Sequence, residues 1–176
     1  AVGKPWHDMA DHDLAEKRRA LLVRLGRGTE VLTELWSAFE THPSEHTYDA
    51  LMGHVPVEEQ AAWRTRALGV PPAGGLGGAL GLYRRAEAVD LIAAAVEAAA
   101  HEALEAVSHY KLEPIAASLE PAHVALAAKV YRALGWRIVT AGKSRYYAEA
   151  LAHFQSARRC CLAAGLTKEW AAIGQR

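Results

Sequence analysis

The chain has 176 residues with 20 basic and 20 acidic side chains, so its formal net charge at pH 7 is zero. This balance removes the electrostatic argument for a protein that binds nucleic acid or an anionic membrane surface. No apolar run approaches the ~20 residues of a membrane span, and the two cysteines are adjacent, which favours a reducing, cytoplasmic location.

Residues 1–69 carry the signals of paired helices. A first helix is predicted from Asp13 to Leu25, and three more are expected before residue 70. The predicted caps and breakers of this region are, in chain order, Gly26, Thr29, Pro43, Ser44 and Pro56. The apolar row expected on the buried side of the first helix is Leu14, Leu21, Leu22 and Leu25.

Residues 70–81, VPPAGGLGGALG, contain two prolines and five glycines. This composition predicts a linker between a helical domain at 1–69 and a helical region at 82–176. One continuous solenoid is the alternative organisation.

The region after residue 82 also has helical spacing. Residues 82–109 contain no strong breaker, which leaves one long helix or two as open alternatives, and a short helical segment is expected around Pro114. A helix beginning at Pro121 and one over Ser144–Gly165 follow, the latter with Ser144 as the N-cap and Gly165 as a left-handed C-cap. The row predicted to be buried on that helix is Tyr147, Ala150, Leu151, Phe154, Ala157 and Cys161.

No alternating run indicates a strand, so the predicted fold is all-α, built of antiparallel helical hairpins. Tetratricopeptide (TPR) repeats place small residues where two helices cross and a large ring between them. The residues Tyr147, Ala150, Phe154 and Ala157 have the spacing of the second helix of such a repeat. A TPR-like or α-solenoid arrangement without a sheet is therefore the predicted architecture.

Three segments carry a resemblance to a known family. They are LGRGTEVLTELWSAFETHPS (25–44), LEPIAASLEPAHVALAAKVYRAL (112–134) and GKSRYYAEALAHFQSAR (142–158), followed by Trp170. With these segments the chain resembles a bacterial helical family of unknown function, related to C-terminal regions found beside SWIM-type zinc fingers. The resemblance implies a TPR-like fold and no catalytic residue. Because the chain lacks an initiator methionine and stops just after a helical start, we expect a fragment of a longer protein.

A basic and aromatic surface is the binding site that the sequence favours. Lys129, Arg132 and Trp136 share one side of their predicted helix, away from its apolar row, and Lys143, Arg145 and Tyr146 follow closely. Such a set suits a carboxylate, a phosphate or a peptide. The alternative is that these side chains pair and pack within the protein.

Two weaker groups of reactive side chains remain. His7, Asp8, Asp11 and His12 are candidate metal ligands, and the alternative is a solvated helix start with acids near the positive end of the helix dipole. Cys160 and Cys161 suggest thiol chemistry, but mid-helix placement favours buried small hydrophobic residues.

No nucleophile, base and acid are arranged as a catalytic set, and no cofactor is predicted. We therefore expect an interaction or scaffold module, not an enzyme, whose partner is another protein or another part of a longer chain. An accessory domain of a nucleic-acid-associated, SWIM-linked protein is the alternative, although the zero net charge argues against direct nucleic-acid binding. A metal or thiol enzyme is the third reading, and the oligomeric state stays open.

Overall fold

Helices account for all regular structure in the described part of the chain. The computed structural model describes the backbone of residues 6–142 and 144–173, and the side chains of residues 14–142, 144–168 and 170–171. Within these ranges the chain forms helices and no strand, which confirms the all-α prediction. The chain divides into two units, the first ending at Val70 and the second beginning at Pro71.

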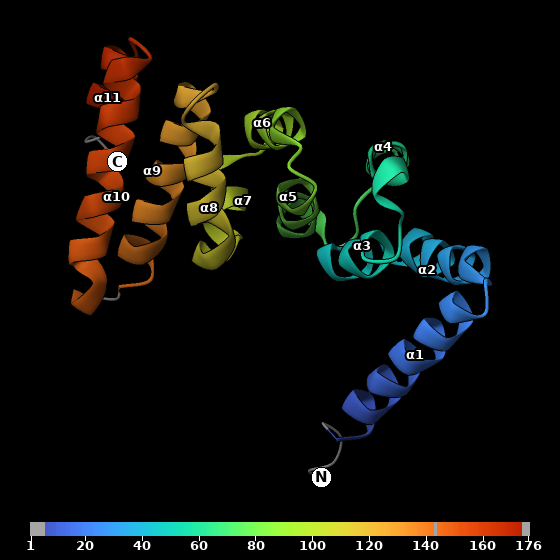
Figure 1. Cartoon of the computed structure of the whole chain (residues 1–176). Helices are drawn as coiled ribbons and strands as arrows, with labels where there is room; N and C mark the ends of the chain where they lie inside the picture. The colour runs from blue at the N-terminus through green and yellow to red at the C-terminus, as the bar shows by residue number, and fades with distance from the viewer. Residues whose placement is uncertain (1–5, 143, 174–176) are drawn as a thin grey trace. The chain divides into compact units, whose positions relative to one another are not determined.

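The first unit contains α1 (Trp6–Arg24), α2 (Gly28–Thr41), α3 (Glu45–Met52), the short 3-10 turn η1 (Val57–Glu59) and α4 (Gln60–Leu68) (Figure 1). Ser44 is the N-cap of α3, as predicted: its hydroxyl accepts from the backbone N–H of Thr47, and the Thr47 hydroxyl accepts from the N–H of Ser44. Thr29 lies inside α2, and no side chain caps that helix.

Aromatic rings form the centre of the first unit. The Trp36 ring lies 5.7 Å from that of Phe39 and 5.6 Å from that of Trp63, centroid to centroid. The guanidinium of Arg66 lies 3.8 Å above the Trp36 ring, a cation–π contact. The Phe39 ring also lies 6.4 Å from the Tyr48 ring of α3, and Phe39 and Leu51 are fully buried. These contacts join α2, α3 and α4 around one small core.

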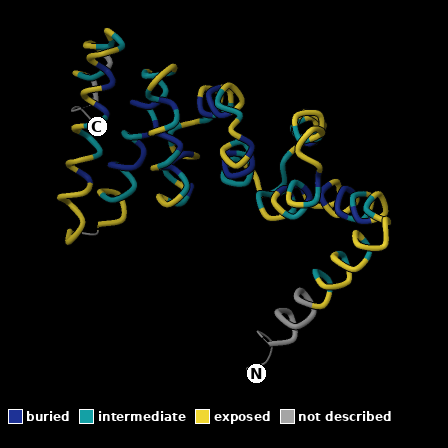
Figure 2. The backbone as a smooth tube through the Cα atoms, in the orientation of Figure 1, coloured by how far each residue is buried: buried dark blue, intermediate teal, exposed yellow. Residues whose placement is uncertain are grey.

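The leucine row that was predicted to be buried on the first helix is largely exposed. Leu14, Leu21 and Leu25 are 67%, 57% and 71% exposed, and Figure 2 shows most of the described part of α1 as exposed. The side of α1 turned to α2 is held by charge, since Arg18 and Arg19 both pair with Glu34. Sequence spacing identified an apolar row but not which face meets the neighbouring helix.

The second unit contains α5 (Gly75–Arg85), α6 (Val89–Ala98), α7 (His101–Ala106), α8 (His109–Leu119), α9 (Val124–Thr140), the 3-10 turn η2 (Ser144–Tyr146), α10 (Tyr147–Ala163) and α11 (Thr167–Ile173). The stretch 82–109 is thus neither one helix nor two. Glu87, with a left-handed φ of 53°, separates α5 from α6, and extended residues separate α6, α7 and α8.

The predicted linker at 70–81 is wrong over its second half, because residues 75–81 belong to α5. A Cβ at Gly78 would collide with the carbonyl oxygen of Ala73. Glycine at position 78 permits a close approach of backbone to backbone, so this glycine serves packing at a helix start and not a flexible connection. The division between units falls at the proline pair that opens the segment.

Helices α9 and α10 form an antiparallel hairpin (Figure 1). Small residues occur at their contact: Gly135 on α9 lies against Phe154 of α10, and Ala150 and Ala157 are buried on α10. A Cβ at Gly135 would lie 2.8 Å from the ring of Phe154, so the two helices approach closely at this point. Gly165 has a φ of 73° just after α10, as predicted for its C-cap.

The start and exposed side of α10 differ from the prediction. Ser144 lies in η2 and not at an N-cap, and the helix begins at Tyr147 without a capping side chain. Tyr147 and Leu151 are 49% and 58% exposed, whereas Ala150, Ala157 and Cys161 are buried. The contact with α9 covers one face of α10, and the predicted row was wider than that face.

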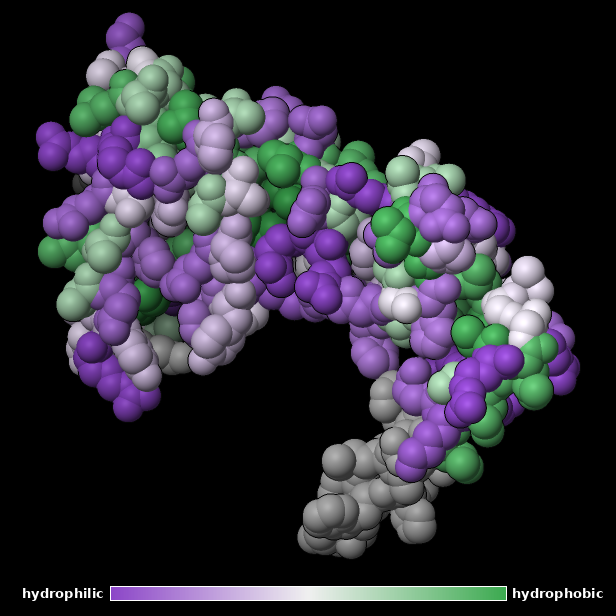
Figure 3. All heavy atoms as spheres, in the orientation of Figure 1, coloured by the Kyte–Doolittle hydropathy of each residue, from purple (hydrophilic) through white to green (hydrophobic). Residues whose placement is uncertain are grey.

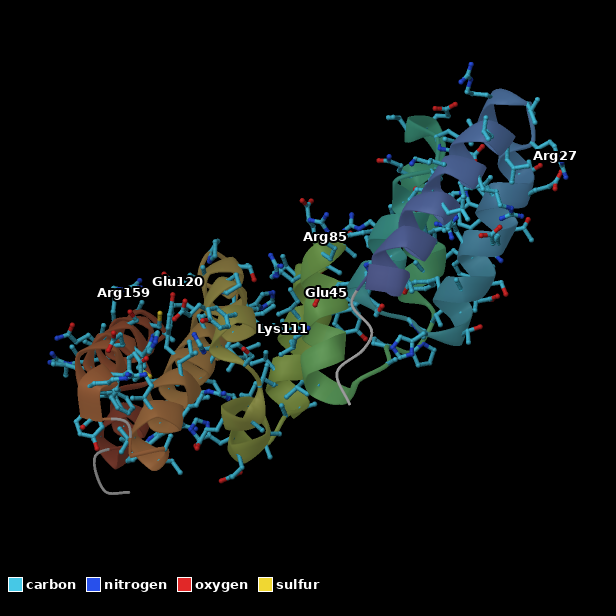
Figure 4. The ribbon with its side chains drawn as sticks, turned by 90° about the horizontal axis from the view of Figure 1, so that it is seen from below. Arg27, Glu45, Arg85, Lys111, Glu120 and Arg159 are labelled. Atoms are coloured by element: carbon cyan, nitrogen blue, oxygen red, sulfur yellow. The ribbon has the colours of Figure 1, made fainter. Side chains whose placement is uncertain are left out.

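An ion pair between Arg159 and Glu120 connects α10 to the loop between α8 and α9. Arg159 donates two hydrogen bonds to the Glu120 carboxylate, at 2.8 and 2.9 Å, and Tyr131 donates a third at 2.7 Å. Figure 4 shows Arg159 and Glu120 side by side. These bonds lower the pKa of Glu120 to about 2, while burial and the same carboxylate raise the pKa of Tyr131 to about 12.

Within the described residues, no helix is both long enough and apolar enough to span a bilayer.

Candidate functional site

The residues of the predicted basic surface point in different directions. Lys129 turns to the end of α6, where its ammonium donates to the carbonyl oxygens of Val96 and Ala99, both at 2.7 Å, and of Glu97 at 3.0 Å. These carbonyls include some that the last turn of a helix leaves without a partner. Burial lowers the pKa of Lys129, and neighbouring Arg132 lowers it further. The geometry assigns Lys129 a structural role as the cap of α6.

Arg132 and Trp136 also face neighbouring helices. The Arg132 Nη2 lies 3.3 Å from His101 Nδ1 on α7. The Trp136 ring packs edge-on against Phe154 of α10, with centroids 5.6 Å apart. The alternative that these side chains pack within the protein therefore agrees with their contacts.

The remaining members of the predicted surface lie at the turn between α9 and α10. Lys143 falls outside the described residues. The guanidinium of Arg145 lies 4.6 Å above the ring of its neighbour Tyr146. Of the five described members, Tyr146 alone lines the cleft described next.

A cleft of about 510 Å³ opens where α8 begins, α9 ends and α10 begins. Figure 3 shows this recess at the lower ends of these helices, with hydrophobic atoms at the bottom and hydrophilic atoms around it. Its lining residues are His109, Tyr110 and Glu113 from α8, Leu134, Arg137, Ile138 and Ala141 at α9, and Tyr146, Glu149 and His153 from η2 and α10. Apolar side chains of α9 form a floor between two polar walls.

The two walls meet at His153. Its Nε2 lies 3.6 Å from a carboxylate oxygen of Glu113 across the cleft, and its ring stacks at 6.5 Å on Tyr131. Burial lowers the pKa of His153, and His109 lowers it further, while Glu113 and Glu149 oppose this shift. With its pKa below the usual 6.5, the imidazole is mainly neutral at pH 7.

Arg137 is the only arginine or lysine among the described residues of the lining, and the end of α7 holds its guanidinium. Its Nη1 donates to the carbonyl oxygens of Glu105 and Val107, both at 2.7 Å, at the end of α7. A helix C-terminus carries partial negative charge, so this contact offsets part of the guanidinium charge.

Aromatic rings stand at the edge of the cleft. The ring of Tyr110, which is 79% exposed, lies 3.8 Å from that of His109. Tyr146, in η2 just before α10, also lines the cleft. Exposed aromatic side chains of this kind supply contact area at low entropic cost when a partner binds.

The other predicted chemistry receives no support from the described side chains. His7, Asp8, Asp11 and His12 lie on α1, outside the residues whose side chains are described. Among the side chains that are described, no group of three or more histidine, cysteine or acidic residues is arranged to hold a metal. Cys160 and Cys161 are buried, and burial raises the pKa of the Cys160 thiol, which disfavours the reactive thiolate.

Sequence reasoning missed most of the cleft. Its polar walls come from two pairs spaced four residues apart, His109 with Glu113 and Glu149 with His153, in mirrored order. That spacing places each pair on one helical face. The pairs lie 36 residues or more apart in sequence, so only the packing of α8 and α10 against α9 brings them together.

No family model, no curated protein and no solved structure matches this chain.

Proposed function

We propose that this chain is a TPR-like helical interaction module that receives a segment of a protein in the cleft between α8, α9 and α10. The segment belongs to a partner or to a longer chain of which this sequence is a part. The observation that carries the proposal is the cleft itself: an open recess of about 510 Å³ with an apolar floor, polar walls and exposed tyrosines. Grooves with these features suit short peptide segments.

The hairpin packing supports the TPR-like part of the proposal. Gly135 on α9 and the buried alanines at 150 and 157 on α10 let the two helices approach, and Phe154 fills the space beside Gly135. TPR repeats use small residues and a ring in this manner. The resemblance to SWIM-associated regions remains part of the proposal, as does a cytoplasmic location, which rests on the adjacent cysteines.

The experiment is a selection of displayed random dodecapeptides on the full chain, followed by affinity measurements with the enriched peptides. Ala141 is exposed at the floor of the cleft, so Ala141→Trp fills the recess with little disturbance of the core. Ala125 is exposed at the other end of the same helix, and Ala125→Trp is the matched control.

Peptides are expected to be enriched, to lose affinity by about 10-fold or more with Ala141→Trp, and to bind Ala125→Trp as they bind the unaltered chain. The proposal fails if no peptide is enriched, or if the enriched peptides bind the two variants equally.

A further inference from the structure

The charge of the cleft indicates which kind of segment it receives. Among the described residues of its lining, two are glutamates and one is an arginine, so acidic side chains outnumber basic ones there by one. The Arg137 Nη1 donates hydrogen bonds to two carbonyl oxygens at the end of α7. The charge presented to a ligand is therefore dominated by the two carboxylates.

These carboxylates come from opposite walls and converge on His153. Glu113 of α8 is 51% exposed and approaches the His153 imidazole at 3.6 Å. Glu149 of α10 precedes His153 by one helical turn and acts electrostatically on the same ring. Because a neutral imidazole compensates neither negative charge, both carboxylates keep the capacity to accept hydrogen bonds from a cation.

The α8 wall and the rim add acceptors and π faces. Pro114 has no N–H, so the carbonyl oxygen of Tyr110 does not receive the helical hydrogen bond from residue 114 and is the added acceptor. The rings of Tyr110 and Tyr146 line the opening, and aromatic faces attract lysine and arginine side chains. Below them, Leu134, Ile138 and Ala141 provide an apolar floor.

We infer that the cleft recognises a basic residue next to an aliphatic one: the lysine or arginine side chain lies between Glu113 and Glu149, and the aliphatic side chain rests on the floor. This inference rests on the proposed function, since it names the chemistry of the segment that the cleft receives. The opposite preference would be for an acidic ligand, with a phosphate or a free carboxylate bound to Arg137.

The test uses the peptides enriched in the selection on the full chain. Their shared motif is expected to contain a basic residue beside an aliphatic one. Affinities are then measured by calorimetry for the unaltered chain and for Glu113→Gln/Glu149→Gln, with Asp90→Asn/Glu97→Gln as a control that removes two carboxylates of α6 outside the cleft. Circular dichroism and thermal unfolding verify that each variant is folded.

The cleft variant is expected to bind about 10- to 100-fold more weakly, as expected for losing charge-assisted hydrogen bonds, and the control within about 2-fold. Replacing the basic residue of the peptide by norleucine is expected to cause a similar loss on the unaltered chain and little further loss on the cleft variant.

Two outcomes separate this inference from the proposed function. If peptides bind in the cleft but are acidic or uncharged, or if they bind Glu113→Gln/Glu149→Gln undiminished, the inference is wrong while the interaction module stands. If no peptide is enriched, or if filling the cleft with Ala141→Trp changes no affinity, the proposed function itself is wrong and the inference falls with it.

Discussion

Removal of the Lys129 ammonium tests whether this residue belongs to a binding surface, as the sequence predicted, or has a structural role. In Lys129→Met the aliphatic stem is kept but the ammonium is removed, so the carbonyl oxygens of Val96, Glu97 and Ala99 lose its three hydrogen bonds. Val96 and Ala99 accept at part-buried positions, where lost hydrogen bonds are costly, whereas the exposed carbonyl of Glu97 regains a bond from water.

The expected loss of stability is about 2–3 kcal/mol. A hydrogen bond from a charged donor contributes roughly 1.5–3 kcal/mol, and a cation at a helix C-terminus roughly 0.3–1 kcal/mol. We take the total well below the sum over three bonds, because water replaces part of what is lost and the three bonds share one ammonium group.

The assay is thermal unfolding followed by circular dichroism, together with amide hydrogen exchange of α6 and α9. Exchange in both helices is expected to accelerate, because the contact joins them. Lys168→Met on α11, which removes an exposed lysine, is the matched control and is expected to change stability by less than about 0.5 kcal/mol. A Lys129→Met variant as stable as this control would refute the capping role. If this variant were stable but bound the enriched peptides more weakly, the basic and aromatic surface predicted from sequence would be supported instead.

Three further predictions concern packing and charge. Gly135→Ala should lower stability by about 1 kcal/mol because its Cβ meets the Phe154 ring at 2.8 Å, whereas Gly77→Ala, whose Cβ has room, should raise stability by about 0.5–1 kcal/mol; calorimetry distinguishes these signs. Glu87→Gly should raise stability by about 0.5–1 kcal/mol, since φ is 53° there, and a lower unfolding temperature would contradict this. The Glu120 pKa is depressed from 4.5 to about 2, so its stabilising effect is full above pH 4.5 and is lost as pH falls toward 2; Glu120→Gln should flatten that part of the stability profile, and an unchanged acid profile would argue against the Arg159 contact.

Features set by neighbouring residues were predictable from sequence. The Ser44 cap depends on Thr47 three residues later, and the Gly165 cap depends on the left-handed conformation that glycine tolerates. The helical periodicity around Phe154 likewise predicted α10. In each case the physical cause lies within a few positions along the chain.

Features set by the packing of distant segments were not predictable. The glycines at 75–81 suggested a linker because composition does not reveal that Gly78 lies against the Ala73 carbonyl. Lys129 suggested a free cation because its acceptors lie 30 to 33 residues earlier in the chain. The cleft was missed for the same reason, since Glu113 and His153 meet only after α8 and α10 have packed on α9.

The most direct test of the account is to locate the bound peptide on the full chain by backbone amide chemical-shift mapping. With an enriched peptide, the largest changes are expected at residues 109–113, 134–141 and 146–153, and Ala141→Trp should abolish them. Changes centred on other helices, or changes that persist in Ala141→Trp, would contradict the assignment of the cleft as the binding site.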